Sequence, residues 1–148
     1  MATILPPDFK EFLRLLNSNG VEYLLIGGYA VNYYGYARAT ADMDVWIALH
    51  PQNAERLVSA VGEFGFKNVT ADTFLNKQIV RFGVPPFRIE LLSAISGVEF
   101  ENCYTQRRNV LLDGIPVSLI SLEQLKANKR AAGLLKDLND LEQLKTPE

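Results

Sequence analysis

Two aspartates, Asp42 and Asp44, have the types and spacing that most directly indicate chemistry. They lie at the start of MDVWIAL (43–49), an apolar run of strand length. Side chains alternate along a strand, so both carboxylates point to one side and repel each other unless a cation lies between them. A hard cation such as Mg²⁺ (or Mn²⁺) prefers such oxygen ligands. The alternative is that both aspartates lie in a solvated turn before the strand.

A third carboxylate, Glu90, stands in the otherwise apolar run FRIELL (87–92). The alternation of this strand places Arg88, Glu90 and Leu92 on one face. Glu90 is therefore a candidate to join the aspartate pair. The alternative is an exposed residue that simply pairs with Arg88.

A glycine pair, Gly27-Gly28, separates a predicted strand (21–26) from a predicted short helix (29–37). Glycine lets backbone approach a phosphate closely, and a helix N-terminus favours an anion. The pair is also compatible with an ordinary tight turn.

Arg38 and Thr40 precede the aspartates. The planar guanidinium group of arginine can clamp a phosphate. The alternative for Arg38 is a solvated surface side chain.

The elements that must position these residues follow from periodicity and end signals. Phe9, Phe12, Leu13 and Leu16 recur at helical spacing, with Asp8 and Glu11 as an expected capping box. A second helix is expected to open at His50-Pro51, with His50 as its cap, and to stop at Gly65.

Later segments predict strands and then helices. Strands are expected in 77–84 and 87–95, with a turn at Pro85-Pro86, and a hairpin in 109–120 around Asp113-Gly114. Ser121 is expected to begin a C-terminal helical region with a break near Gly133. Its apolar stripe is formed by Leu122, Leu125, Ala132, Leu135, Leu138 and Leu141. The order predicts an α+β fold, a mixed sheet covered by helices.

Composition bounds the class of protein. The 148 residues fit one domain (1–148), and the formal net charge of −2 indicates no strong overall attraction to nucleic acid or membrane. A local basic groove is still compatible with that charge. The single cysteine, Cys103, excludes a disulfide framework and suits a reducing compartment. With no signal peptide or membrane-spanning run, a cytoplasmic protein is expected.

Other polar and aromatic residues carry weaker signals. Four tyrosines, Tyr29, Tyr33, Tyr34 and Tyr36, are candidates to stack on a base or acceptor, or to pack in the core. Trp46 follows Asp44 on the same face, so it is expected either to wall the site or to belong to the core.

Taken together, Gly27-Gly28, Arg38-x-Thr40-x-Asp42-x-Asp44 and Glu90 resemble the polymerase-beta-type nucleotidyltransferase superfamily. The resemblance covers roughly residues 20–142. The C-terminal segment is also similar to a small bacterial branch related to abortive-infection (AbiEii-like) nucleotidyltransferase toxins. Lys129, Gly133, Lys136 and Asp137 match that branch, whereas Leu134 stands where the branch usually has arginine.

The resemblance implies transfer of a nucleoside monophosphate from a nucleoside triphosphate to an acceptor hydroxyl, with Mg²⁺ or Mn²⁺. It implies that Asp42 and Asp44 bind metal and that Glu90 completes the site as a ligand or general base.

The nucleotide would be held by several further positions. Gly27 and Gly28 would admit the triphosphate, and Arg38 and Thr40 would contact phosphate or its loop. Lys129 and Lys136 are further phosphate candidates, with solvated helix lysines as the alternative.

Acceptor and partners stay open at this point: a tRNA end, a protein hydroxyl or a small molecule such as an aminoglycoside or lincosamide. A second subunit could complete the acceptor surface, and a toxin or antitoxin falls within this reading. The alternative function is a non-catalytic module of the same fold that binds a nucleotide or a partner protein.

Overall fold

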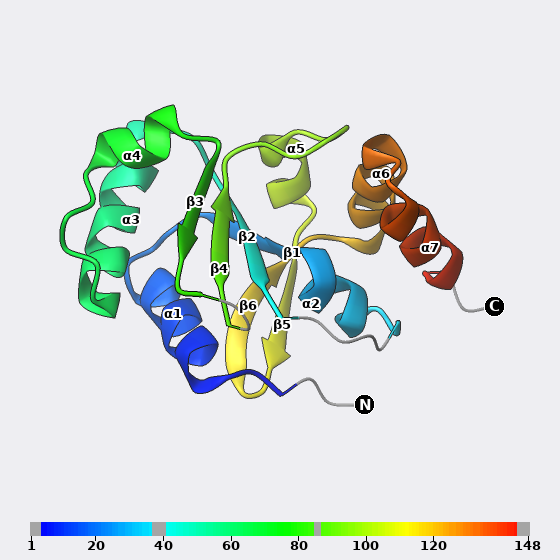
Figure 1. Ribbon diagram of the computed structural model, residues 1–148, viewed down its shortest axis with the longest axis horizontal. Helices are drawn as coiled ribbons and strands as arrows, with labels where there is room; N and C mark the ends of the chain where they lie inside the picture. Colours follow the sequence, from blue (N-terminus) through cyan, green and yellow to red (C-terminus); the bar gives the residue numbers. More distant parts are fainter. Residues whose placement is uncertain (1–3, 37–40, 85–86, 145–148) are drawn as a thin grey trace.

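A six-stranded mixed sheet forms the centre of the molecule, with the strand order β3-β4-β2-β1-β6-β5 (Figure 1). The computed structural model describes residues 4–36, 41–84 and 87–144. The strands are β1 (Tyr23–Ile26), β2 (Met43–Ile47), β3 (Ile79–Phe82), β4 (Ile89–Leu92), β5 (Arg108–Leu112) and β6 (Ile115–Leu119). The helices are α1 (Pro7–Ser18), α2 (Gly27–Tyr33), α3 (Pro51–Phe64), α4 (Ala71–Asn76), α5 (Phe100–Thr105), α6 (Leu122–Ala132) and α7 (Leu135–Gln143). The predicted mixed sheet with flanking helices is confirmed.

The pairing of the central strands decides where the polar side chains lie. β2 pairs with β1 in antiparallel and with β4 in parallel orientation. In the β2–β4 register, Asp44 lies opposite Glu90 and Val45 opposite Leu91. Laterally paired residues point to the same side of a sheet, so one side of this pair is apolar and the other carries carboxylates.

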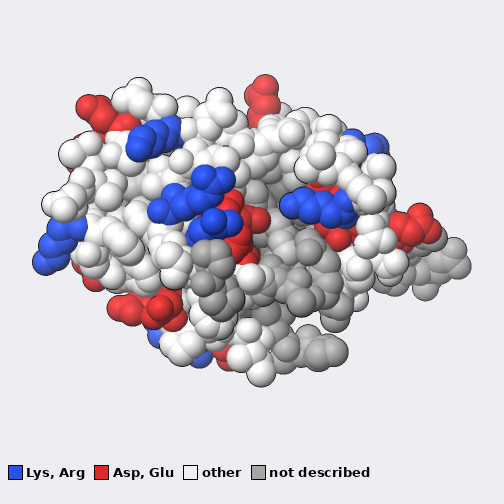
Figure 2. Space-filling model, in the orientation of Figure 1, with Lys and Arg blue, Asp and Glu red and all other residues white. Residues whose placement is uncertain are grey.

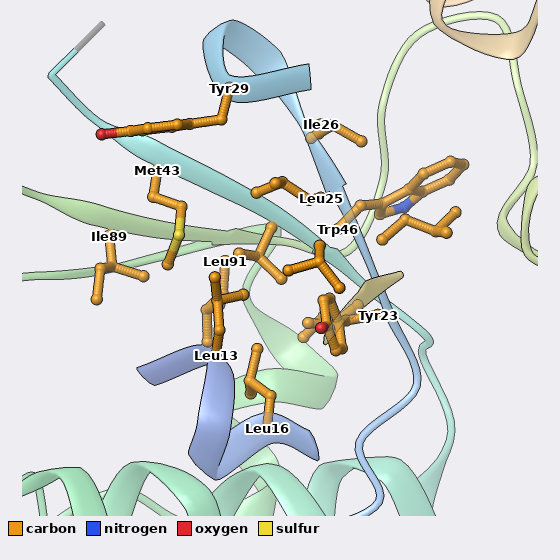
Figure 3. Close-up of a cluster of buried hydrophobic side chains, with 14 of the residues drawn as sticks. Leu13, Leu16, Tyr23, Leu25, Ile26, Tyr29, Met43, Trp46, Ile89 and Leu91 are labelled. Carbon is orange, nitrogen blue, oxygen red and sulfur yellow. The ribbon is translucent and has the colours of Figure 1, made fainter. Parts of the chain in front are cut away.

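The apolar side of the sheet packs on α1 and α3. Figure 3 shows Leu13 and Leu16 of α1 in one buried cluster with Leu25 and Leu91 of the sheet. Burying a leucine side chain of this kind stabilises a fold by about 1.5–3 kcal/mol. This face of the sheet is therefore the main core, and it fixes which side chains remain on the other face.

The opposite face is covered in part by α5. Trp46 of β2 is 1% exposed, and its ring meets the ring of Phe100 edge-on with 5.2 Å between centroids. Of the two roles expected for Trp46, the structure shows the core role.

The helix that opens at His50-Pro51 has the expected ends. The His50 side chain accepts a hydrogen bond from the backbone N–H of Asn53, and the chain leaves α3 at Gly65 with φ of 125°. The capping role of His50 is confirmed.

The capping box expected for the first helix is wrong. Helix α1 begins at Pro7, one residue before Asp8, and no side chain caps it. Proline has φ preset near the helical value and no N–H to satisfy, so Pro7 starts the helix and Asp8 falls in its first turn.

Three further differences concern where helices lie and which leucines are buried. Helix α2 begins at Gly27 rather than after the glycine pair. Helices α4 and α5 occupy segments with no expected helix. The C-terminal apolar stripe is wrong for α7, because Leu135 is 85% exposed and Leu138 is also exposed.

The hairpin and the helix break are as expected. Asp113 and Gly114 form the turn between β5 and β6 with positive φ at both residues. Ser121 caps α6 through the N–H of Gln124, and Gly133 ends it in the left-handed conformation. No helix in the described part of the chain has the length and apolarity to cross a membrane.

Candidate active site

Three carboxylates gather on the face of the sheet opposite α1. The β2–β4 register places Asp44 beside Glu90, and Asp42 precedes Asp44 by two residues. Glu90 lies 46 positions beyond Asp44 in the sequence, and the two meet because their parallel strands are neighbours in the sheet. The order of the segments in the chain does not reveal this pairing.

Two arginines form ion pairs with this group. The Nη2 atom of Arg88 lies 3.0 Å from Oδ2 of Asp42 and 3.2 Å from Oε1 of Glu90. The Nε atom of Arg81 lies 3.3 Å from the same Oε1 atom of Glu90. Glu90 therefore pairs with Arg88, as its alternative role predicted. It also lies beside Asp44, as its role in the site predicted.

Arg81 is a site residue that sequence reasoning missed. It stands opposite Glu90 in the antiparallel β3–β4 register, so both side chains lie on the same side. The alternation within KQIVRFGV (77–84) contained that signal. Its use required the knowledge that β3 pairs with β4.

Burial and the neighbouring carboxylates act on the pKa of Asp44. Its pKa is raised to about 6, first by burial and then by the negative charges of Glu90 and Asp42. Lys136 and Lys129 act in the opposite direction and lower it. The carboxylate group therefore has an excess of negative charge that a further cation would relieve.

Gly27 is packed directly against this carboxylate. Its φ is 69°, and a Cβ atom at this position would overlap the Oδ2 atom of Asp44. The end of β1 can thus approach the aspartate only because residue 27 has no side chain. Gly28, the next residue, is buried in the first turn of α2.

The donor set is compatible with a divalent cation, although the side chains do not form a metal centre as they lie. In the described ranges, no three His, Cys, Asp or Glu side chains are arranged to hold one ion. The three carboxylates supply hard oxygen atoms on one side of the sheet, and a guanidinium cation already bridges two of them. By donor chemistry the residues fit a divalent ion in place of that guanidinium group.

The two C-terminal lysines differ from each other. Lys129 is 6% exposed, and its Nζ atom lies 3.2 Å from Oδ1 of Asp137 and 3.2 Å from Oδ2 of Asp140. These ion pairs join α6 to α7, so Lys129 is not the solvated side chain of its alternative role. Lys136 is exposed at the start of α7, near enough to Asp44 to lower its pKa.

Figure 2 shows the charges on one face of the molecule: acidic surface near the centre, with basic surface on both sides of it.

Arg38 and Thr40 lie outside the described residues, so their expected roles stay predictions.

The tyrosines of the N-terminal half serve packing and anchoring. Tyr29 is buried, and Tyr34 donates a hydrogen bond to the carbonyl oxygen of Ile120. The hydroxyl oxygen of Tyr36 accepts a hydrogen bond from Asn139, which ties α7 to the segment that follows α2. These contacts favour the structural role over stacking on a ligand.

The sequence matches one family model over residues 7–147, described as a nucleotidyl transferase of unknown function (DUF2204). The chain belongs to this family. It is thus an enzyme of the nucleotidyltransferase class, as the resemblance implied, whereas the abortive-infection branch stays a prediction. Among curated proteins, none matches the sequence.

Solved structures of the same fold include an antibiotic adenylyltransferase and an antibiotic-resistance factor. The lincomycin-bound lincosamide antibiotic adenylyltransferase LnuA has a TM-score of 0.59 and 15% identity, over 97% of this chain and 98% of that chain. The antibiotic-resistance factor ANT(2″)-Ia has a TM-score of 0.60 and 10% identity, over 93% of this chain and 80% of that chain. An antigenic nucleotidyltransferase-like protein from Paracoccidioides brasiliensis has a TM-score of 0.55 and 15% identity, over 91% and 71%. At these identities the likeness concerns the fold.

Proposed function

We propose that residues 1–148 form one nucleotidyltransferase domain that uses Mg²⁺ or Mn²⁺ to transfer a nucleoside monophosphate from a nucleoside triphosphate to an acceptor hydroxyl. The observation that carries this proposal is the alignment of Asp44 with Glu90 on one side of the sheet, with Asp42 two residues away and Gly27 in contact. Family membership supports the reaction class.

The divalent ions would supply charge neutralisation and activation of the attacking oxygen. Asp42 and Asp44 would hold them in the ionised form. Glu90 would complete the site, as a further ligand or by accepting the proton of the acceptor hydroxyl at a carboxylate oxygen. The acceptor oxygen forms a bond to the α-phosphorus, the bond from that phosphorus to the β-phosphate oxygen breaks, and pyrophosphate leaves.

The remaining residues would bind and orient the triphosphate. Gly27 lets the backbone at the start of α2 lie close to Asp44, and with Gly28 it would admit the triphosphate there. Lys136 would contribute positive charge from α7, while Arg38 and Thr40 would contact phosphate. Lys129 would act mainly by holding α7 in place, because its amine is paired with two aspartates.

The test combines binding with turnover. The protein is incubated with radiolabelled nucleoside triphosphates, Mg²⁺ and cell extract, and nucleotide binding is followed by calorimetry with and without Mg²⁺. We expect a labelled product and metal-dependent binding, both lost in Asp42→Asn and Asp44→Asn. Equal labelling by the wild type and Asp44→Asn would remove the proposal, and binding without turnover would favour the non-catalytic module.

A cellular setting as part of a toxin–antitoxin pair is supported by the resemblance of residues 129–137 to the abortive-infection branch. Induced expression in a bacterium lacking the neighbouring genes tests it. Growth arrest that Asp44→Asn abolishes is expected for a toxin; unchanged growth would contradict that role.

A further inference from the structure

The part of the site on the β3 side of Glu90 is basic and open to solvent. The segment 77–92 contains three basic residues and one acidic residue, in a chain whose net charge is −2. Arg81 is an exposed residue on the edge strand β3, and Ile79, also on β3, is 39% exposed. This surface lies beyond Glu90 on the side away from β1, because the strand order is β3-β4-β2-β1.

The sheet order also places the glycine pair and Arg81 on opposite sides of Asp44. Gly27 follows β1 and lies on one side of Asp44, whereas Glu90 and Arg81 lie on the other. If the triphosphate uses the glycine side, the acceptor approaches from the side of β3. The chemistry of that surface then selects the acceptor.

Cation binding would release both guanidinium groups toward that acceptor. Arg88 contacts Asp42 and Glu90, and Arg81 contacts Glu90; these are carboxylates that would hold the divalent ions, so the ions would compete with both guanidinium groups for them. Within the segment 77–92, Glu90 is the only acidic residue among three basic ones. Planar guanidinium groups bind phosphate in a bidentate manner and repel cationic ligands.

From this arrangement, which rests on the proposed function, we infer that the acceptor hydroxyl belongs to a phosphate-bearing molecule whose phosphate is bound by Arg81 and Arg88. Lincomycin, which is bound in the LnuA structure, and the aminoglycosides carry no phosphate, so two guanidinium groups would not favour them. The phosphate could belong to a mononucleotide or to the end of an oligonucleotide, and the experiment distinguishes these sources.

The experiment offers four acceptors in parallel with radiolabelled nucleoside triphosphate and Mg²⁺: a nucleoside 5′-monophosphate, a short RNA with a free 3′-hydroxyl, kanamycin and lincomycin. Label is expected on one or both phosphate-bearing acceptors. Label confined to kanamycin or lincomycin would overturn the inference while leaving the proposed function intact.

A binding measurement decides the case independently of turnover. Fluorescein-labelled RNA of the same sequence, or a fluorescent mononucleotide, is titrated with protein in the presence of Mg²⁺ and followed by anisotropy. Arg81→Gln is expected to weaken the binding of the preferred probe by about tenfold, because a charge-assisted hydrogen bond is lost, with Arg81→Lys intermediate. Arg56→Gln, on α3, is the matched control and leaves the affinity unchanged.

Kinetics with the labelled acceptor separates binding from positioning of Glu90. Arg81→Gln is expected to raise KM for the phosphate-bearing acceptor and to leave KM for the nucleoside triphosphate unchanged. Equal affinity of Arg81→Gln and wild type for both probes would overturn the inference. If no acceptor is labelled and Asp44→Asn binds nucleoside triphosphate as the wild type does, the proposed function itself fails.

Discussion

Gly27 is the residue at which the smallest substitution should disturb the site most. Gly27→Ala places a Cβ atom on the Asp44 carboxylate at a φ of 69°. A left-handed alanine costs about 1–2 kcal/mol, and the overlap adds roughly 1–3 kcal/mol. Urea denaturation should therefore show a loss of about 2–5 kcal/mol. Gly20→Ala is the matched control, with φ of 67° and open space, and it should show the first cost alone; equal losses would contradict the close contact.

The raised pKa of Asp44 predicts that the stability of the fold depends on pH in an unusual direction. Its folded-state pKa is about 6, above the ordinary value, so between pH 4 and 6 the folded protein binds more protons than the unfolded chain. Stability therefore falls as pH rises through this window, and the full cost is present above pH 6. Asp44→Asn should stabilise the metal-free protein at pH 7.5 by about 1–2 kcal/mol and reduce this pH dependence.

The readout for Asp44 is thermal unfolding between pH 4.5 and 8 in EDTA. For a domain of this size, the gain corresponds to about 3–6 °C in Tm. Glu55→Gln, an exposed carboxyl on α3, serves as the control. A destabilised Asp44→Asn protein would show that the carboxylate is held by favourable contacts rather than by repulsion.

At the scale of the elements, the ion pairs between α6 and α7 hold the C-terminal wall of the site. Lys129→Met leaves Asp137 and Asp140 buried without their cation. Removal of one partner from a buried ion pair costs about 3–5 kcal/mol. We expect a loss of that size in urea denaturation, against less than 0.5 kcal/mol, roughly, for Lys136→Met at an exposed position. Equal, small losses would contradict the stabilising role of these ion pairs.

Several elements could be predicted because a local signal specifies them. The turn at Asp113-Gly114 and the cap at His50 are set by residues within a few positions of each other. The strands around Asp44 and Glu90 follow from alternation and apolar content. Alternation predicts which residues share a face within each strand. That Asp44 and Glu90 lie on neighbouring strands depends on the strand order, which the sequence does not show.

The features that sequence missed depend on distant partners. Lys129 reads as a surface lysine until α7 folds back and buries its amine between two aspartates. Arg81 is recognised as a site residue only from the β3–β4 register, which places it opposite Glu90. Periodicity predicts core positions for the leucines of α7, yet its buried residues are Asp137 and Asp140, which pair with Lys129.

For the whole molecule, the account predicts that ligands stabilise the fold through the carboxylate group. Mg²⁺ with a nucleoside triphosphate at about 100 times Kd should add about 2.7 kcal/mol of stability to the wild type. The triphosphate without Mg²⁺, or both ligands with Asp44→Asn, should add much less. Differential scanning calorimetry measures this; equal stabilisation in Asp44→Asn would place the ligand elsewhere on the molecule.

The most direct test of the central claim is a crystal grown with Mn²⁺ and a non-hydrolysable nucleoside triphosphate, with the anomalous signal of manganese recorded. The account predicts an anomalous peak at about 2.0–2.3 Å from carboxylate oxygens of Asp42 and Asp44, with Arg88 moved from its present contact. A manganese peak remote from these aspartates, with Arg88 still bridging Asp42 and Glu90, would contradict it.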